Sequence, residues 1–219
     1  MCGIFGIFSD SPVVDSILEG LTKLEYRGYD SSGIAVLKSN NSIRTERAKG
    51  KLKNLSQKIK NKDLVGNIGI GHTRWATHGI PSTNNAHPHS SEDVSIVHNG
   101  IIENYSKLKI TLKKKGFKFQ SQTDSEVIAH LLSYHLRNND PKKAIKNTLS
   151  SLEGAFAIAI LFKGFNLLAG ARRGSPLAIG LSKNSTYRYG YLLYPQVDLS
   201  IAKDDLSVSY FIIGTILPG

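Results

Sequence analysis

The chain has 219 residues, 40% of them hydrophobic, and a formal net charge of +11. That length and apolar content suffice for a substantial core, while a single cysteine excludes an intramolecular disulfide and therefore a disulfide-stapled secreted scaffold. The longest apolar run, 155–162, is far shorter than the roughly 20 residues that cross a bilayer, and no signal peptide is recognised, so we expect a cytoplasmic protein with no membrane partner.

Short apolar runs bounded by turn residues predict strands in the first half of the chain, at 3–8, 33–37, 43–48, 67–75 and 94–100. A helix is predicted between the first two, with Ser11 at its N-cap, Pro12 in its first turn and its end before Gly28. A short amphipathic helix follows near 51–60. The polar segment 76–93 is rich in Gly, Pro, Asn and Ser and is predicted to be a long surface loop, a kind of segment that is often functional.

Three helices are predicted in the second half of the chain, near 103–115, 124–138 and 141–152. The second begins with a capping-box pattern in which Thr123 and Glu126 satisfy each other's backbone donors, and the third begins at Asp140 and Pro141. Apolar runs predict a hairpin and then one more strand, at 155–162, 167–174 and 175–181. Because strands and helices come in runs rather than in strict alternation, the predicted fold class is α+β with antiparallel sheets.

The excess of lysine and arginine raises nucleic acid as a partner, because clustered cations release counterions from a phosphate backbone. The lysines concentrate at 51–62 and 107–118, where apolar residues recur at helical spacing. These charges therefore indicate the solvated faces of amphipathic helices. The sequence has no zinc-finger, basic-zipper or RNA-recognition pattern, so no nucleic-acid partner is predicted.

Cys2 directly follows the first methionine and admits two interpretations. It is either a small apolar residue of an edge strand, since free cysteine is often buried, or a nucleophile that gains its own base when Met1 is removed and the α-amine becomes free. Its position alone does not decide between them.

Five of the seven histidines lie between residues 72 and 98, so a metal site has to be considered. Neither an HExxH motif nor a paired CxxC motif occurs, and loop histidines with hydrogen-bonding roles are the preferred interpretation. No metal and no cofactor is therefore predicted. A serine hydrolase is set aside because the sequence has no GxSxG elbow.

Seven blocks follow one another along the chain: CGIFGI, LEYRGYDSSGIA, GIGHTRWATHG, NAHPH, VHNGIIENY, SQTDSEVIAHLL and LEGAFAIAIL. Together they resemble the class II glutamine amidotransferases and, within that class, the glutamine:fructose-6-phosphate amidotransferases, also called glucosamine-6-phosphate synthases. The resemblance implies an N-terminal-nucleophile fold, a four-layer αββα sandwich of two antiparallel sheets flanked by helices, in a glutaminase domain at 2–182. Residues 183–219 do not match the family, and we interpret them as an atypical, frame-shifted or truncated tail, with the sugar-isomerase domains absent.

The resemblance assigns catalysis to three residues. Cys2 is the nucleophile that attacks the side-chain amide of glutamine, and its own α-amine is the base. An α-amine with a pKa of about 7.7–8.0 suits that role near pH 7. Asn99 and Gly100 supply hydrogen-bond donors to the oxyanion, although Asn-Gly by itself is also a strong hairpin-turn signal.

Substrate binding is assigned to five residues by the same resemblance. Arg74 holds the α-carboxylate of glutamine and Asp124 holds its α-ammonium group, and a guanidinium suits a carboxylate because it makes two parallel hydrogen bonds. From the residues alone, a surface ion pair for Arg74 and a helix first-turn acid for Asp124 stay open. Trp75, otherwise a core aromatic residue, belongs with Thr77 and His78 to a loop that closes over bound glutamine.

Three further residues are given orienting or coupling roles. Arg27 resembles the family arginine that orients the cysteine, and Gly28 lets the backbone pass closely. His87 resembles a histidine that links the glutamine site to the sugar site, and a solvated loop histidine is the alternative.

The implied function is hydrolysis of glutamine to glutamate and ammonia through a γ-glutamyl thioester on Cys2, the glutaminase half of glucosamine-6-phosphate synthesis. Glutamine is the expected partner, and fructose 6-phosphate enters only through a missing or separate isomerase domain. The alternative is a catalytically inactive or unstable remnant of a truncated synthase that acts at most as a binding module.

Overall fold

The computed structural model describes residues 2–178 and 208–214, which form two antiparallel sheets. The first sheet has the order β1-β4-β2-β3 and is built from β1 (Gly3–Phe8), β2 (Ser31–Leu37), β3 (Ile43–Lys49) and β4 (Ile68–Arg74). The second sheet has the order β5-β6-β7-β8-β9 and is built from β5 (His89–Ser91), β6 (Val94–Gly100), β7 (Phe156–Phe162), β8 (Leu167–Arg173) and β9 (Val208–Gly214).

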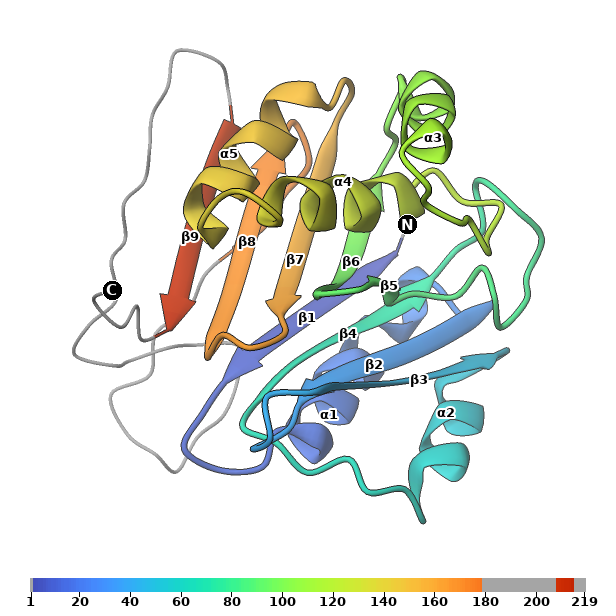
Figure 1. Ribbon diagram of the computed structural model, residues 1–219. Coiled ribbons are helices and arrows are strands. Elements are labelled where there is room, and N and C mark those ends of the chain that lie inside the picture. Colours follow the sequence, from blue (N-terminus) through green and yellow to red (C-terminus); the bar gives the residue numbers. More distant parts are fainter. Residues whose placement is uncertain (1, 179–207, 215–219) are drawn as a thin grey trace.

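Helices cover the outer faces of both sheets (Figure 1). On the first sheet lie α1 (Val14–Leu24), which is followed by a short 3-10 helix (Glu25–Arg27), and α2 (Leu52–Ile59). On the second sheet lie α4 (Glu126–Leu136) and α5 (Pro141–Ser151), while α3 (Tyr105–Lys114) packs beside α4. The predicted α+β class and the αββα sandwich are thus confirmed.

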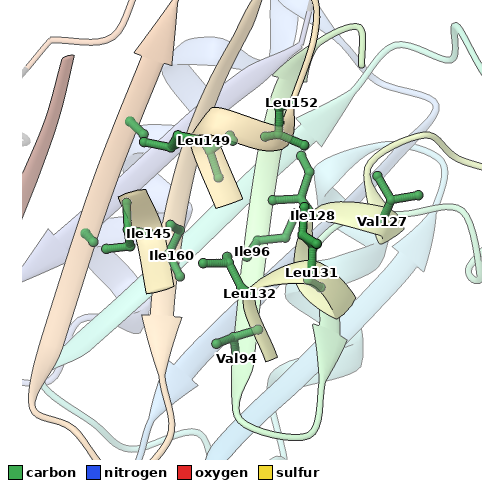
Figure 2. Packing of buried hydrophobic residues seen from close by; sticks show 14 of the residues in the cluster. Val94, Ile96, Val127, Ile128, Leu131, Leu132, Ile145, Leu149, Leu152 and Ile160 are labelled. Carbon is green, nitrogen blue, oxygen red and sulfur yellow. The ribbon is translucent and has the colours of Figure 1, made fainter. Parts of the chain in front are cut away.

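Apolar side chains fill the spaces between the layers. Figure 2 shows the outer core of the second sheet, where Leu132 of α4 and Ile145 and Leu149 of α5 gather around Ile96 and Ile160 of the strands. Between the two sheets lies a separate cluster, formed by Ala35, Leu37, Ile68, Ile70, Val97, Ala159, Leu161 and Leu168. The sandwich is therefore held by burial on both faces of each sheet.

Most predicted elements are present, and β7 pairs with β8 as the predicted hairpin requires. The helix at α5 begins as predicted, because the Asp140 side chain accepts a hydrogen bond from the Lys143 N–H. The N-cap predicted at Ser11 is wrong: α1 begins at Val14, after Val13. The Val13 N–H instead donates to the Gly66 carbonyl, and its side chain is fully buried, so a tertiary contact sets the start of this helix.

The capping box predicted at Thr123 and Glu126 is also wrong. The Glu126 carboxylate accepts hydrogen bonds from the Gln120 and Ser121 N–H groups, at 2.8 and 2.7 Å. The Thr123 hydroxyl contacts His89 Nε2 at 3.0 Å instead of the helix backbone. A partner from a distant segment replaces the local one, and the helix begins only at Glu126.

The surface loop predicted at 76–93 is wrong in its second half, where residues 85–89 are buried and β5 begins at His89. Hydrogen bonds offset the cost of burying the polar groups of this segment. Asn85 accepts from the Gln122 N–H and donates to the Ile80 carbonyl, both at 2.9 Å, and Arg47 donates to the Ala86 carbonyl at 3.3 Å.

The strand predicted at 175–181 is absent from its described part, 175–178, and 179–181 lie outside the described residues. The tail predicted at 183–219 also lies outside them, apart from β9, which pairs antiparallel with β8. In the described part of the chain, no helix combines the length and the apolar character that a membrane span requires.

Leu161 of β7 is fully buried between the two sheets. We expect Leu161→Ala to lower the free energy of unfolding by about 2–5 kcal/mol, because it leaves a cavity that the neighbouring side chains fill only in part. The matched control is Ile110→Ala on α3, whose side chain is 60% exposed and whose loss changes stability by about 0.5 kcal/mol or less. Urea denaturation followed by circular dichroism measures both, and equal values would contradict the interlayer core.

Candidate active site

A cavity of about 470 Å³ opens where the start of β1 meets the ends of β4 and β6. This volume is in the range of small-molecule sites, about 300–1,000 Å³. The cavity is lined by ten of the predicted site residues, namely Cys2, Arg27, Arg74, Trp75, Thr77, His78, His87, Asn99, Gly100 and Asp124. The remaining one, Gly28, lies behind the wall, where a Cβ atom would come within 2.7 Å of the Arg74 carbonyl carbon.

The Cys2 thiol lies against the backbone that follows β4. Its Sγ accepts a hydrogen bond from the Trp75 N–H at 3.2 Å and lies 3.5 Å from the Trp75 carbonyl oxygen. Burial raises the pKa of the thiol, and the Trp75 hydrogen bond offsets only part of that rise. The thiol is therefore protonated near neutral pH, and a nucleophilic role requires a base.

Asn99 and Gly100 stand at the end of β6, facing the start of β1. The Asn99 Nδ2 donates to the Cys2 carbonyl oxygen at 3.1 Å, so the amide is directed toward the cysteine. Gly100 has a φ of 132°, and a Cβ atom there would lie 2.1 Å from the Ala155 carbonyl oxygen. Only glycine fits this position.

Arg74 is almost fully buried, which excludes the interpretation as a surface ion pair. Its Nη2 donates to the carbonyl oxygens of His78 and Gly79, and so holds the loop after β4 in a closed turn. Its Nη1 lies 3.6 Å from Asp30 Oδ1 but makes no hydrogen bond within the described residues. The guanidinium is thus held by the loop carbonyls and by Asp30, and it supplies a buried positive charge to the cavity that Arg74 lines.

Asp124 lies just before α4 and is also buried. Its Oδ2 accepts a hydrogen bond from the Ile102 N–H at 2.8 Å, and its Oδ1 has only a long contact of 3.4 Å to the Ser125 hydroxyl. No cationic side chain of the described residues pairs with it. A buried carboxylate with spare acceptor capacity is suited to bind a cationic group of a ligand.

The loop after β4 forms one side of the cavity mouth. Trp75 is 48% exposed, which excludes a core aromatic, and its ring meets the ring of Tyr29 edge to face at 5.5 Å between centroids. Thr77 is exposed, and the half-buried His78 packs against Tyr105, with their ring centroids 5.7 Å apart. Arg27, in the short 3-10 helix after α1, also lines the cavity and is half-buried.

His87 is not the solvated loop histidine considered from the sequence, because only 4% of it is exposed. Its ring packs between those of His72 and His89, at centroid distances of 4.1 and 4.6 Å. Burial lowers the pKa of His87 well below its usual value, lowers those of His72 and His89 to about 3, and lowers that of His98 to about 4. These four rings are neutral near pH 7.

Sequence reasoning missed three residues that the fold brings to the site. His98 and Ser125 line the cavity, with His98 Nδ1 and the Ser125 hydroxyl 2.8 Å apart, and His72 contacts Asn99 from behind. Their positions in the sequence could have identified them. His98 and Ser125 are the immediate neighbours of Asn99 and Asp124, and His72 is two residues before Arg74. Among the described residues, no group of three or more His, Cys, Asp or Glu side chains is arranged to hold a metal ion.

Comparison with known proteins agrees with this geometry. The family model of the glutamine amidotransferase domain matches residues 72–187. The isomerizing glutamine–fructose-6-phosphate aminotransferase of Bradyrhizobium diazoefficiens is 50% identical over 189 residues, which cover 85% of this chain and 31% of the relative. That of Mesorhizobium japonicum is 53% identical over 182 residues, covering 82% of this chain and 30% of the relative. The chain thus spans about a third of the length of these relatives.

A solved structure has the same architecture. Glutamine phosphoribosylpyrophosphate amidotransferase from B. subtilis, in complex with ADP and GMP, superposes with a TM-score of 0.73 at 29% identity. The superposition covers 84% of this chain and 40% of that one. The sandwich architecture is therefore shared with an enzyme of a different amidotransferase type.

The buried histidines predict a stability that falls in acid. Because the folded-state pKa values of His72, His89 and His98 lie at about 3 to 4, below the unfolded value of about 6.5, the unfolded chain binds more protons as the pH falls below about 6.5. The free energy of unfolding should have its full value above about pH 6.5 and should be lower by about 2 kcal/mol per histidine at pH 5. Urea denaturation at pH 7.5, 6 and 5 measures the decrease.

His87→Gln provides the control for this prediction, because glutamine does not titrate. The variant should lose less stability between pH 7.5 and pH 5 than the wild type, whatever its stability at pH 7.5. A free energy of unfolding that is constant over this range in the wild type would show that the buried rings do not govern its acid sensitivity.

Proposed function

The chain belongs to the glutamine amidotransferase family, and we propose that it hydrolyses glutamine to glutamate and ammonia at the Cys2 cavity. The observation that supports this most directly is the convergence of the Cys2 thiol, the Asn99 amide and the buried Arg74 and Asp124 charges on one cavity. Hydrolysis of the side-chain amide of a free amino acid requires a nucleophile, a hydrogen-bond donor to the oxyanion, and two opposite charges that bind the α-carboxylate and the α-ammonium group.

The proposed first step uses the α-amine that removal of Met1 would expose on Cys2. This amine takes the thiol proton while Sγ attacks the side-chain carbonyl carbon of glutamine. A base is needed because burial raises the pKa of the thiol, and an α-amine with a pKa of about 7.7–8.0 is partly neutral near pH 7. The tetrahedral intermediate then carries its negative charge on the former amide oxygen.

Asn99 Nδ2 and the Gly100 N–H are the proposed donors to this oxyanion. Both lie at the end of β6, beside the cysteine. When the intermediate collapses, the carbon–nitrogen bond breaks and the leaving nitrogen takes the proton from the α-ammonium group, which releases ammonia. Water then attacks the γ-glutamyl thioester, which gives glutamate and restores the thiol.

Arg74 and Asp124 are proposed to bind the α-carboxylate and the α-ammonium group of glutamine. The buried positive charge of Arg74 and the spare acceptor capacity of Asp124, both in the cavity wall, support this assignment. Trp75, Thr77 and His78 would then cover the bound substrate, since their loop forms the cavity mouth.

We further propose that residues 2–182 act as a glutaminase domain and that 183–219 are an atypical tail, of which β9 extends the second sheet of that domain. Transfer of the ammonia to fructose 6-phosphate is proposed only together with the isomerase part of a synthase, because the match covers 31% of the relative. A reduced Cys2 thiol is best maintained in a reducing compartment, which supports a cytoplasmic location.

Cys2→Ala is expected to abolish glutamate release, by at least about 10³-fold, because it removes the nucleophile. Ile110→Ala, on the exposed face of α3, is the activity control. The assay measures glutamate and ammonia, and intact-mass analysis establishes which residue begins the protein. Protein that retains Met1 should be inactive, since its cysteine nitrogen is then an amide.

Two outcomes would reject the proposed chemistry. Equal activity in Cys2→Ala would exclude the cysteine as nucleophile. Glutamine binding by the wild-type protein without any glutamate release would favour the alternative, a binding module.

Asp124→Asn and Arg74→Lys are expected to raise the KM for glutamine, because each weakens a buried charged contact that is remote from the scissile amide. A loss of about 2 kcal/mol corresponds to about a 30-fold change. Glu126→Gln is the matched control: Glu126 is as buried as Asp124 and lies two residues away, but it does not line the cavity. The control should lower stability and leave the KM unchanged. A KM that rises equally in all three variants would contradict the assignment.

A further inference from the structure

His72 joins the two sheets behind the proposed oxyanion site. It lies in β4, two residues before Arg74, and is fully buried. Its Nε2 lies 2.9 Å from Asn99 Oδ1 and 3.2 Å from the His98 carbonyl oxygen, both in β6 of the opposite sheet. One nitrogen of the ring therefore meets two oxygen atoms at the end of the strand that carries Asn99.

These contacts select one tautomer of the ring. The His98 carbonyl can only accept a hydrogen bond, so Nε2 must carry the hydrogen. Burial lowers the pKa of His72 to about 3, so near pH 7 the ring has a single N–H, and Nδ1 is a bare lone pair. Nδ1 is buried and has no hydrogen-bond partner within the described residues. In the other tautomer a buried N–H would be unpaired and a lone pair would face two oxygens, which is the more costly arrangement.

The tautomer in turn fixes the orientation of the Asn99 amide. Because Nε2 is a donor, the Asn99 atom in front of it must be the acceptor Oδ1. Nδ2 then points the other way, toward Cys2, where it donates to the carbonyl oxygen at 3.1 Å. A flipped amide would place two donors against each other at His72 and two acceptors against each other at Cys2.

The ring of His87 limits the movement of His72. The ring of His87 packs against it at 4.1 Å between centroids, with 36° between the ring planes, and His87 is itself buried. A donor whose direction is fixed before the substrate arrives needs no reorganisation during the reaction.

We propose that His72 is a positioning residue for glutamine hydrolysis, which it serves by donating from Nε2 to Asn99 and so keeping the Asn99 NH2 group directed at the oxyanion. The inference rests on the proposed function and adds a residue to it. An amide NH2 group has two hydrogens. One is engaged by the Cys2 carbonyl, and the second is left for the oxyanion.

The first test compares His72→Leu with His72→Gln. Leucine removes the donor, and glutamine can place an amide N–H close to the position of Nε2. Loss of one oxyanion donor costs roughly 10²–10³ in kcat, so His72→Leu should lower kcat by roughly 10²-fold with the KM nearly unchanged. His72→Gln should recover most of that loss. A KM defect in place of the kcat defect, or no recovery with glutamine in a folded protein, would overturn the proposal.

The second test is a double-mutant cycle with Asn99→Ala. If His72 acts through Asn99, the double variant His72→Leu/Asn99→Ala should hydrolyse glutamine no more slowly than Asn99→Ala alone. Rate losses that multiply would show that His72 acts by another route and would overturn the proposal. Where His72→Leu does not fold, His72→Phe, which keeps a ring and removes the donor, replaces it in the cycle, and the expected result is again no further loss.

A third measurement does not depend on activity. ¹⁵N NMR of labelled histidine in the wild-type chain should show a neutral His72 with its hydrogen on Nε2, and His72→Gln or His72→Leu should shift the side-chain amide signals of Asn99. A hydrogen on Nδ1 would overturn the proposal. If the wild-type chain does not hydrolyse glutamine, the proposed function fails, and this measurement still decides whether His72 holds Asn99.

Discussion

The antiparallel pairing of β1 with β4 is the constraint on which the site depends. Its first pair joins Gly3 to Thr73, so the residue before Gly3 is placed against the residues after β4, and the Cys2 thiol meets the Trp75 backbone. The same strand β4 faces the second sheet and presents His72 and Arg74 on that side. A slip of one residue in this register would turn both side chains to the opposite face. The register therefore fixes the Cys2 thiol and its surroundings together.

Burial of polar groups next to that pairing sets the electrostatics of the cavity. The rings of His72, His87, His89 and His98 are held in their neutral forms because burial disfavours their charged forms. The cavity wall thus contains a guanidinium and a carboxylate, on Arg74 and Asp124, without buried imidazolium charge between them. Such a field suits a ligand that carries one group of each sign.

Local sequence patterns correctly predicted the strands and helices whose bounds depend on residues close in the sequence. Apolar runs identified β1, β7 and β8, and Asp140 with Pro141 identified the start of α5. The failures share a physical cause: Val13, Thr123 and the segment 85–89 have partners far away in the chain, such as Gly66 for Val13 and His89 for Thr123. The assigned cavity residues came from motif resemblance, whereas His72 was missed although it stands two places before Arg74 on the same strand face. Its role depends on β6, which the motif around it does not contain.

The same burial bears on which group can serve as the base for Cys2. A proton moves readily only between groups of similar pKa. The pKa of the thiol is raised, while that of His98, a histidine in the cavity wall, is lowered to about 4, so transfer from the thiol to this ring is strongly uphill. An α-amine, at about 7.7–8.0, lies much closer to the thiol. The buried rings therefore do not suit the role of base, which agrees with the proposed role of the Cys2 α-amine.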